Sequence, residues 1–247
     1  LHYLHRRQRQ MCIRDSEDPM YILAGLPFIA PDYSSAWLLK DVQMEYLQEK
    51  FDKKGLMILY TAPWPGQGFY TKFPVNSVSD FSGKKLRIYS TATQQMGSML
   101  GFNATILPFA EIPQAFSTGL IEALFTSPQT GIDIQAWDNT KHFTYAGAIF
   151  SKNAVVVTKK AFNALSKGDQ SNMLAAAKKA ELRGWEMSAE TTKKQIDILK
   201  KNGMSSKNAP DEVISKMKSI GLEMMKNWRS KASPEANAVL DRYLSMR

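Results

Sequence analysis

The chain has 247 residues, of which 44% are hydrophobic and 22% charged, and its formal net charge at pH 7 is +9. This composition is typical of a globular protein with one large or two small domains. No stretch reaches the roughly 18–20 consecutive apolar residues of a membrane helix, because the best segment, 20–30, is interrupted by Gly25 and Pro27. The sequence therefore excludes a membrane-spanning protein.

Residues 1–16 (LHYLHRRQRQMCIRDS) have neither a helical nor a strand period, and they lack the order of regions found in a signal peptide. We expect a non-native or disordered leader, and a basic arm that binds nucleic acid is the alternative. Without this leader the net charge falls to +6, Cys12 is lost and His142 is the only histidine. The remainder has no thiol for catalysis or for a thiolate metal site.

From Glu17 onward, helical and strand periods alternate along the chain until only helices remain. Thr91 and Gln94 are expected to form a capping box, and Ser127 is expected to cap a helix that has Pro128 in its first turn. The expected strands cover residues 56–60, 69–73, 85–89, 104–107, 121–126, 143–149 and 154–158. The expected helices cover residues 33–51, 91–101, 110–118, 128–139, 166–201, 209–229 and 233–246.

This order of elements predicts an α/β protein with a helical C-terminal extension. The pattern begins abruptly, since Glu17-Asp18-Pro19 leads directly into an apolar segment. An α/β domain usually offers a first strand and helix before such a segment. We therefore expect that the first strands are missing from this sequence.

Enzymatic function is disfavoured by the motifs that the sequence lacks. It has no dinucleotide-binding glycine pattern, no phosphate-binding loop and no nucleophile elbow. His142 is interpreted as a surface or capping residue, and no cluster of acids and histidines has metal-ligand spacing. The lysines of the C-terminal helices alternate with acids and are read as solvated faces rather than a nucleic-acid surface. We expect no catalytic residue, no metal and no cofactor.

Three polar segments lie at the ends of expected strands, where ligands of open α/β sheets bind. In A-P-W-P-G-Q-G (62–68), prolines hold Trp64, although a tight turn with the ring in the core is an alternative. In strand 85–89, the period of two places Arg87 opposite Leu86 and Ile88. A guanidinium matches a carboxylate with two hydrogen bonds, whereas the alternative is an exposed strand arginine. In F-T-S-P-Q-T-G (125–131), a helix start favours an anion, or Ser127 is an ordinary cap.

From Glu17 to about Ser245 the chain resembles the substrate-binding subunits of tripartite ATP-independent periplasmic (TRAP) transporters, the DctP-like family. The resemblance rests on four stretches, and G-K-K-L-R with its spacing to P-F-A-E-I-P-Q-A-F-S-T-G is the most specific part. They are LPFIAPDY (26–33), GLMILYTAPWPGQGFYTKFPVNSVSDFSGKKLRIYSTAT (55–93), LGFNATILPFAEIPQAFSTGLIEALFTSPQTGIDIQAWD (100–138) and KNAVVVTKKAFNAL (152–165).

The resemblance implies a two-domain fold of the periplasmic-binding-protein type that closes about a hinge, with a long helix crossing both domains. Residues 17–90 would be the remainder of the N-terminal α/β domain and 91–165 a second α/β domain with the hinge crossings. Residues 166–247 would form the spanning helix and the C-terminal helices. Members usually carry a signal peptide and about seventy to eighty more residues, which again implies missing first strands.

The resemblance also assigns the binding residues. The family's carboxylate-binding arginine falls on Arg87, and Thr126 or Ser127 replaces the usual asparagine. Trp64 and Tyr89 would pack on the ligand body, while Gln67, Thr126, Ser127 and Gln129 would offer hydrogen bonds.

The implied ligand is a small organic acid, and we expect a monocarboxylate or oxo acid with an apolar or aromatic body. The implied location is the periplasm and the implied partners are the TRAP membrane subunits, with transport driven by a cation gradient. A ligand sensor coupled to a receptor, or an enzyme acting on a carboxylic acid, are the alternatives.

Overall fold

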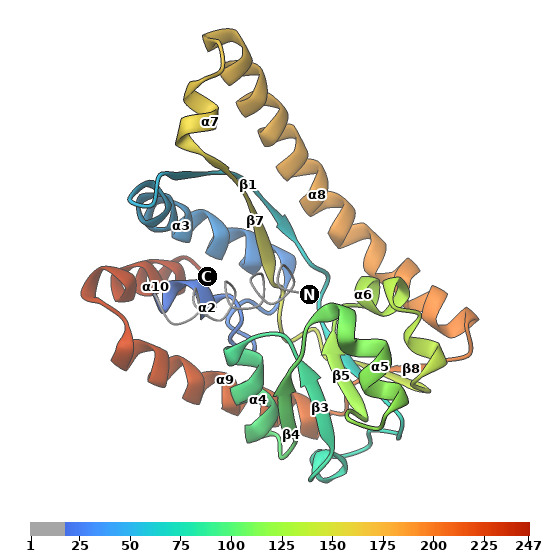
Figure 1. Cartoon of the computed structure of the whole chain (residues 1–247). Helices are drawn as coiled ribbons and strands as arrows, with labels where there is room; N and C mark the ends of the chain where they lie inside the picture. The colour runs from blue at the N-terminus through green and yellow to red at the C-terminus, as the bar shows by residue number, and fades with distance from the viewer. Residues whose placement is uncertain (1–17) are drawn as a thin grey trace.

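The computed structural model describes residues 18–247, in which a six-stranded sheet and a two-stranded ribbon are joined by a long helix (Figure 1). The expectations for residues 1–16, including Cys12, lie outside the described residues. The predicted α/β class is confirmed, and the helical C-terminal extension follows the strands as expected.

The six-stranded sheet has the order β4-β3-β5-β2-β6-β8. β3 runs parallel to β4 and β5, β2 runs antiparallel to β5 and β6, and β6 runs parallel to β8. The carboxyl ends of five strands and the beginning of β2 consequently meet at one edge. The strands are β2 (Gly68–Thr71), β3 (Lys85–Ile88), β4 (Asn103–Ile106), β5 (Ala123–Thr126), β6 (His142–Tyr145) and β8 (Ser205–Asn208).

The ribbon pairs β1 (Leu56–Pro63) with β7 (Lys152–Thr158) in antiparallel register. Two short segments connect it to the sheet: residues 64–67 lead from β1 into β2, and residues 146–151 lead from β6 into β7. We call them the two crossover segments. The strand expected at 143–149 ends at Tyr145, and Gly147 with φ 59° lies in the second crossover segment.

The long helix α8 (Lys167–Lys201) has 35 residues, which corresponds to about 52 Å. It contacts β1 near its middle and α6 and β8 toward its C-terminal end (Figure 1). The Ser166 side chain caps it by accepting a hydrogen bond from the Asp169 N–H. The other helices are α2 (Met20–Leu23), α3 (Tyr33–Asp52), α4 (Thr91–Met99), α5 (Ile112–Ser117), α6 (Pro128–Asp133), α7 (Lys159–Asn163), α9 (Asp211–Lys231) and α10 (Pro234–Met246).

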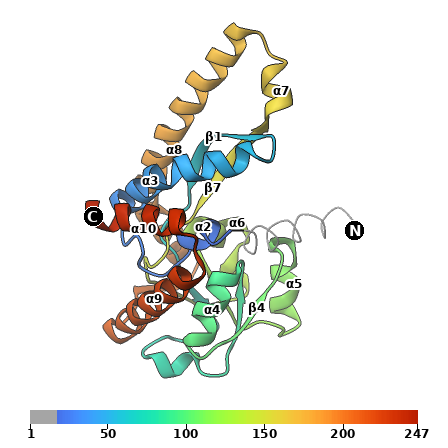
Figure 2. The same cartoon turned by 90° about the vertical axis from the view of Figure 1, so that its left-hand side faces the viewer.

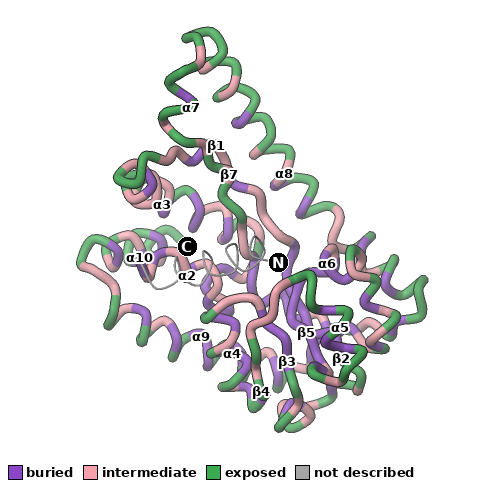
Figure 3. Tube along the Cα trace, viewed as in Figure 1, coloured by how far each residue is buried: buried purple, intermediate pink, exposed green. Residues whose placement is uncertain are grey.

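The sheet is buried on both faces at its centre, and β2, β3 and β5 are the most buried strands of the described residues (Figure 3). One face carries Phe69 and Phe125, which pack with Met96 of α4 and Met217 of α9. The other face carries Leu124, which packs with residues of α5. In Figure 2, α4 and α9 lie on one side of the sheet and α5 lies on the other.

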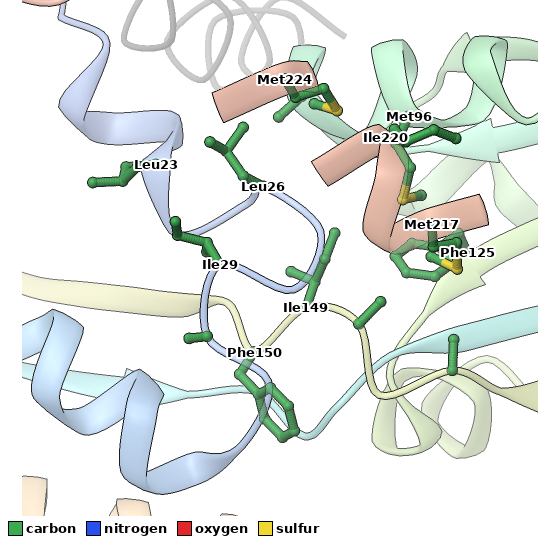
Figure 4. Packing of buried hydrophobic residues seen from close by; sticks show 14 of the residues in the cluster. Leu23, Leu26, Ile29, Met96, Phe125, Ile149, Phe150, Met217, Ile220 and Met224 are labelled. Atoms are coloured by element: carbon green, nitrogen blue, oxygen red, sulfur yellow. The ribbon is translucent and has the colours of Figure 1, made fainter. Parts of the chain in front are cut away.

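The segment between α2 and α3 lies against α9 (Figure 4). Leu26 and Ile29 share a hydrophobic cluster with Ile220 and Met224. The first described residues are therefore held by the C-terminal helices. In contrast, most residues in the N-terminal half of α8 are exposed (Figure 3).

Two sequence expectations need correction. The capping box of α4 is made by Ser90 and Thr93, one residue earlier than the expected pair Thr91 and Gln94. The helix expected at 128–139 breaks after Asp133, because Gln135 adopts a left-handed conformation with φ 49° before a short 3₁₀ turn. Strand β8 was not expected. The expected domain boundary at residue 90 lies between β3 and β4, which are neighbours in the sheet, and the division into domains stays a prediction.

The cap of α4 can be tested by a single substitution. The Ser90 hydroxyl accepts a hydrogen bond from the Thr93 N–H at 3.2 Å. We expect Ser90→Ala to lower the free energy of unfolding by about 1 kcal/mol, since an N–H of the first turn loses its acceptor. Ser98→Ala, at an exposed position of the same helix, should change it by less than about 0.5 kcal/mol. Equal urea midpoints for the two variants would contradict the corrected cap.

Candidate functional site

The edge of the sheet where strand ends meet contains most of the predicted site residues. Tyr89 follows β3, Thr126 ends β5, and Gln67 precedes β2. Gly68 pairs with both Thr126 and Tyr145, so the start of β2 lies between the ends of β5 and β6. The antiparallel strand β2 thus brings the first crossover segment to the same edge as the ends of the parallel strands.

Arg87 lies inside β3, on the sheet face opposite Leu86 and Ile88. Leu86 and Ile88 belong to the cluster that packs on α4 and α9, whereas Arg87 lies beside Leu124 of the other cluster. The period-of-two prediction is therefore confirmed. The alternative of an exposed strand arginine is wrong, because Arg87 is only 5% exposed.

The guanidinium of Arg87 is held by one internal hydrogen bond. Its Nε donates to the Leu107 carbonyl oxygen at 3.1 Å. Burial lowers the pKa of Arg87 to about 10, so the group stays charged at neutral pH. Within residues 18–247, every ion pair involves other side chains. A buried charge without a counterion is costly, which makes an anionic ligand the natural partner.

Tyr89 and Gln67 form a buried hydrogen-bonded pair. The Tyr89 hydroxyl donates to Gln67 Oε1 at 2.8 Å, and Gln67 Nε2 donates to Ser151 Oγ at 3.0 Å. Burial raises the pKa of Tyr89 to about 12, which keeps the phenol protonated at neutral pH. Ser151 was not singled out in the sequence, and no motif around it would have revealed its role.

The segment that follows β5 is engaged within the protein. The Ser127 hydroxyl caps α6 by accepting from the Thr130 N–H at 3.2 Å. Gln129 donates to Asp133 at 2.7 Å and accepts from Gln195 of α8 at 2.9 Å. Thr126 is buried at the end of β5, and the described residues supply no hydrogen-bond partner for its hydroxyl. Of the three, Thr126 retains the most hydrogen-bonding capacity.

Trp64 lies where the ribbon meets the first crossover segment. Its backbone N–H donates to the Ser151 carbonyl oxygen at 2.8 Å. The residue is half-buried, and neither hydrophobic cluster of the described residues contains its ring. The structure therefore places Trp64 beside the site without packing it into the core.

The described residues offer little for metal chemistry. No group of three or more His, Cys, Asp or Glu side chains between residues 18 and 247 is arranged to hold a metal ion. His142 begins β6 and is half-buried. Over the same residues, none of the helices combines the length and apolarity needed to cross a membrane.

A buried arginine close to the carboxyl ends of the sheet strands, at the edge from which two crossover segments lead to the ribbon, fits an α/β solute-binding protein. Residues 15–231 match the family model for the bacterial extracellular solute-binding proteins of family 7, DctP. The chain belongs to this family, whose members bind solutes for transport and are not enzymes.

Solved structures of TRAP solute receptors have the same fold. DctP7 of Bordetella pertussis, an extracytoplasmic solute receptor binding pyroglutamic acid, superimposes with a TM-score of 0.90 at 37% identity, covering 92% of this chain and 76% of that one. A TRAP solute-binding protein from a marine metagenome, specific for pyroglutamate, gives 0.88 at 31% identity and covers 94% and 76%.

A curated solute-binding protein of Chromohalobacter salexigens is a more distant relative. It is 24% identical over 187 residues, which cover 72% of this chain and 55% of that protein. The chain therefore spans about half the length of this curated relative.

Proposed function

We propose that this chain is the solute-binding subunit of a TRAP transporter, that it captures a small monocarboxylate in the periplasm, and that it delivers this solute to the membrane subunits. The observation that carries the proposal is the buried guanidinium of Arg87, which has no carboxylate partner among the described residues. A ligand carboxylate would supply the missing charge through two charge-assisted hydrogen bonds.

Pyroglutamate is the first ligand to consider. It combines one carboxylate with a small lactam ring, which fits the oxo monocarboxylate expected from the sequence. Two receptors that bind pyroglutamate are 37% and 31% identical to this chain. In our proposal Arg87 holds the carboxylate, Trp64 and Tyr89 contact the ring, and Thr126 offers a hydrogen bond. Ser127 and Gln129 would act mainly by shaping the start of α6.

Closure about the two crossover segments would then exclude water from the carboxylate, and the closed form would dock on the membrane subunits. The two crossover segments and α8 are the connections between the ribbon and the sheet. A hinge motion at these three connections would leave the sheet itself intact.

Titration calorimetry with pyroglutamate and with its neutral carboxamide tests whether Arg87 binds the ligand carboxylate. We expect the carboxamide to bind at least about 30-fold more weakly, because a charged hydrogen-bonded pair is worth about 2 kcal/mol or more. A dicarboxylate such as succinate serves as the comparison acid. Equal affinities for pyroglutamate and the carboxamide would rule out carboxylate capture by Arg87.

A further inference from the structure

Both polar atoms of the Gln67 side-chain amide form hydrogen bonds inside the protein. Oε1 accepts from the Tyr89 hydroxyl, and Nε2 donates to Ser151 Oγ. The Gln67 side chain therefore joins the Tyr89 hydroxyl to the Ser151 hydroxyl. Because Gln67 is only 2% exposed, its amide has little surface left for a ligand.

The main chain of Gln67 adds a second set of bonds. Its carbonyl oxygen accepts from the N–H groups of Ala146 and Gly147, at 3.2 and 2.9 Å. Both donors belong to the second crossover segment, and Gln67 belongs to the first. The bond from the Trp64 N–H to the Ser151 carbonyl oxygen closes the same pair of segments at their ribbon end. One residue therefore links both crossover segments to the carboxyl end of β3.

Tyr89 connects Gln67 to the proposed carboxylate site. Tyr89 follows β3, two residues after Arg87, so both residues lie near the carboxyl end of this strand. Burial raises the pKa of Tyr89 and the charge of Arg87 lowers it, which indicates an electrostatic interaction between the two side chains. When the hydrogen bond to Gln67 holds the Tyr89 ring in place, the ring forms one side of the proposed carboxylate site.

We infer that Gln67 is a positioning residue of the carboxylate site, which acts through Tyr89 and ties the site to the two crossover segments without touching the ligand itself. The inference rests on the proposed function, and it replaces the sequence-based expectation that Gln67 offers a hydrogen bond to the ligand. Removing the amide would release the Tyr89 ring and loosen the crossover pair, so carboxylate affinity should fall.

A double-mutant cycle that measures pyroglutamate affinity tests whether Gln67 acts through Tyr89. We expect Gln67→Met and Tyr89→Phe each to weaken binding about 10-fold, and the double variant to lose little more than either single one, because both remove the same hydrogen bond. Gln43→Met is the matched control. Gln43 is another buried glutamine with two side-chain partners, but it lies on α3, so its loss should lower stability and leave affinity within about twofold.

A second ligand separates positioning from direct contact. Cyclopentanecarboxylate has the ring and carboxylate of pyroglutamate but no lactam. A positioning role predicts the same fold-loss for both ligands in Gln67→Met, whereas a direct bond to the lactam predicts a loss for pyroglutamate only. Should Gln67→Met not fold, Ser151→Ala removes the hydrogen bond made by Gln67 Nε2 and is expected to weaken binding of both ligands similarly.

The outcomes distinguish this inference from the proposed function. Wild-type affinity in Gln67→Met, a lactam-restricted loss, or losses that multiply in the double variant would each overturn the positioning role, while Arg87→Met could still abolish binding. If the unsubstituted chain bound neither acid, the proposed function would fail and the inference would fail with it.

Discussion

Arg87→Met is expected to weaken binding of pyroglutamate by about 100- to 1,000-fold, which corresponds to about 3–4 kcal/mol. The substitution removes both the charge and the paired donors that a carboxylate requires, while a side chain of similar length remains in β3. Titration calorimetry measures the loss directly. A loss smaller than about threefold, under 1 kcal/mol, would show that the carboxylate is held elsewhere.

The same substitution should not reduce the stability of the ligand-free chain. The guanidinium is buried, and no described residue forms an ion pair with it. Replacing an uncompensated buried charge with an apolar side chain is neutral or stabilising. We therefore expect an unchanged or higher urea midpoint together with the lost affinity. A lower midpoint would instead indicate a structural role.

Two further variants calibrate the effect of Arg87. Arg87→Lys keeps the charge but loses the planar pair of donors, so its affinity should lie between those of the wild type and Arg87→Met. Arg183→Met removes an exposed arginine from α8, and its affinity should equal that of the wild type.

Gly221→Ala is expected to lower the free energy of unfolding by about 2 kcal/mol or more. Gly221 lies inside α9, where the β-carbon of any other residue would overlap the carbonyl oxygen of Pro27. That oxygen belongs to the main chain and cannot rotate away. The added methyl group would push α9 from the segment between α2 and α3, which packs against it (Figure 4).

Gly184→Ala is the matched control for this clash. Gly184 also lies inside a helix, α8, but apart from its chain neighbours and the backbone of its own helix no atom lies within 4 Å of the position of its added β-carbon. Alanine should therefore stabilise it by about 0.5–1 kcal/mol, as it does in an unobstructed helix. Urea denaturation measures both variants. The two variants should change the free energy of unfolding in opposite directions. A stabilised Gly221→Ala would refute the close approach of Gly221 to the Pro27 carbonyl oxygen.

The sequence predicted those elements whose side chains alternate between apolar and polar in a regular period. Helices α3 and α8 and strand β3 have such a period, so their bounds were close and Arg87 was assigned to the correct face. Strand β8 has the sequence S-S-K-N and is mostly exposed at the end of the sheet. It therefore has no apolar pattern from which it could have been predicted.

Site residues were harder to assign than elements, because a polar side chain looks the same in a sequence whether or not its bonds are already made. Gln67 and Gln129 were both read as donors for a ligand. In the structure the Gln67 amide joins Tyr89 to Ser151, and the Gln129 amide joins Asp133 to Gln195. Ser151 completes the first of these networks from the second crossover segment, far away in sequence.

Because α8 is long, a small tilt near its middle displaces its end by a large distance. Trp185 is packed near its middle, where the indole N–H donates to Thr61 of β1 at 3.2 Å, and about 27 Å of helix separate this point from Lys167. A tilt of about 10° at Trp185 would displace the Lys167 end by about 5 Å. A small angular change at Trp185 would therefore become a large displacement at the Lys167 end of α8.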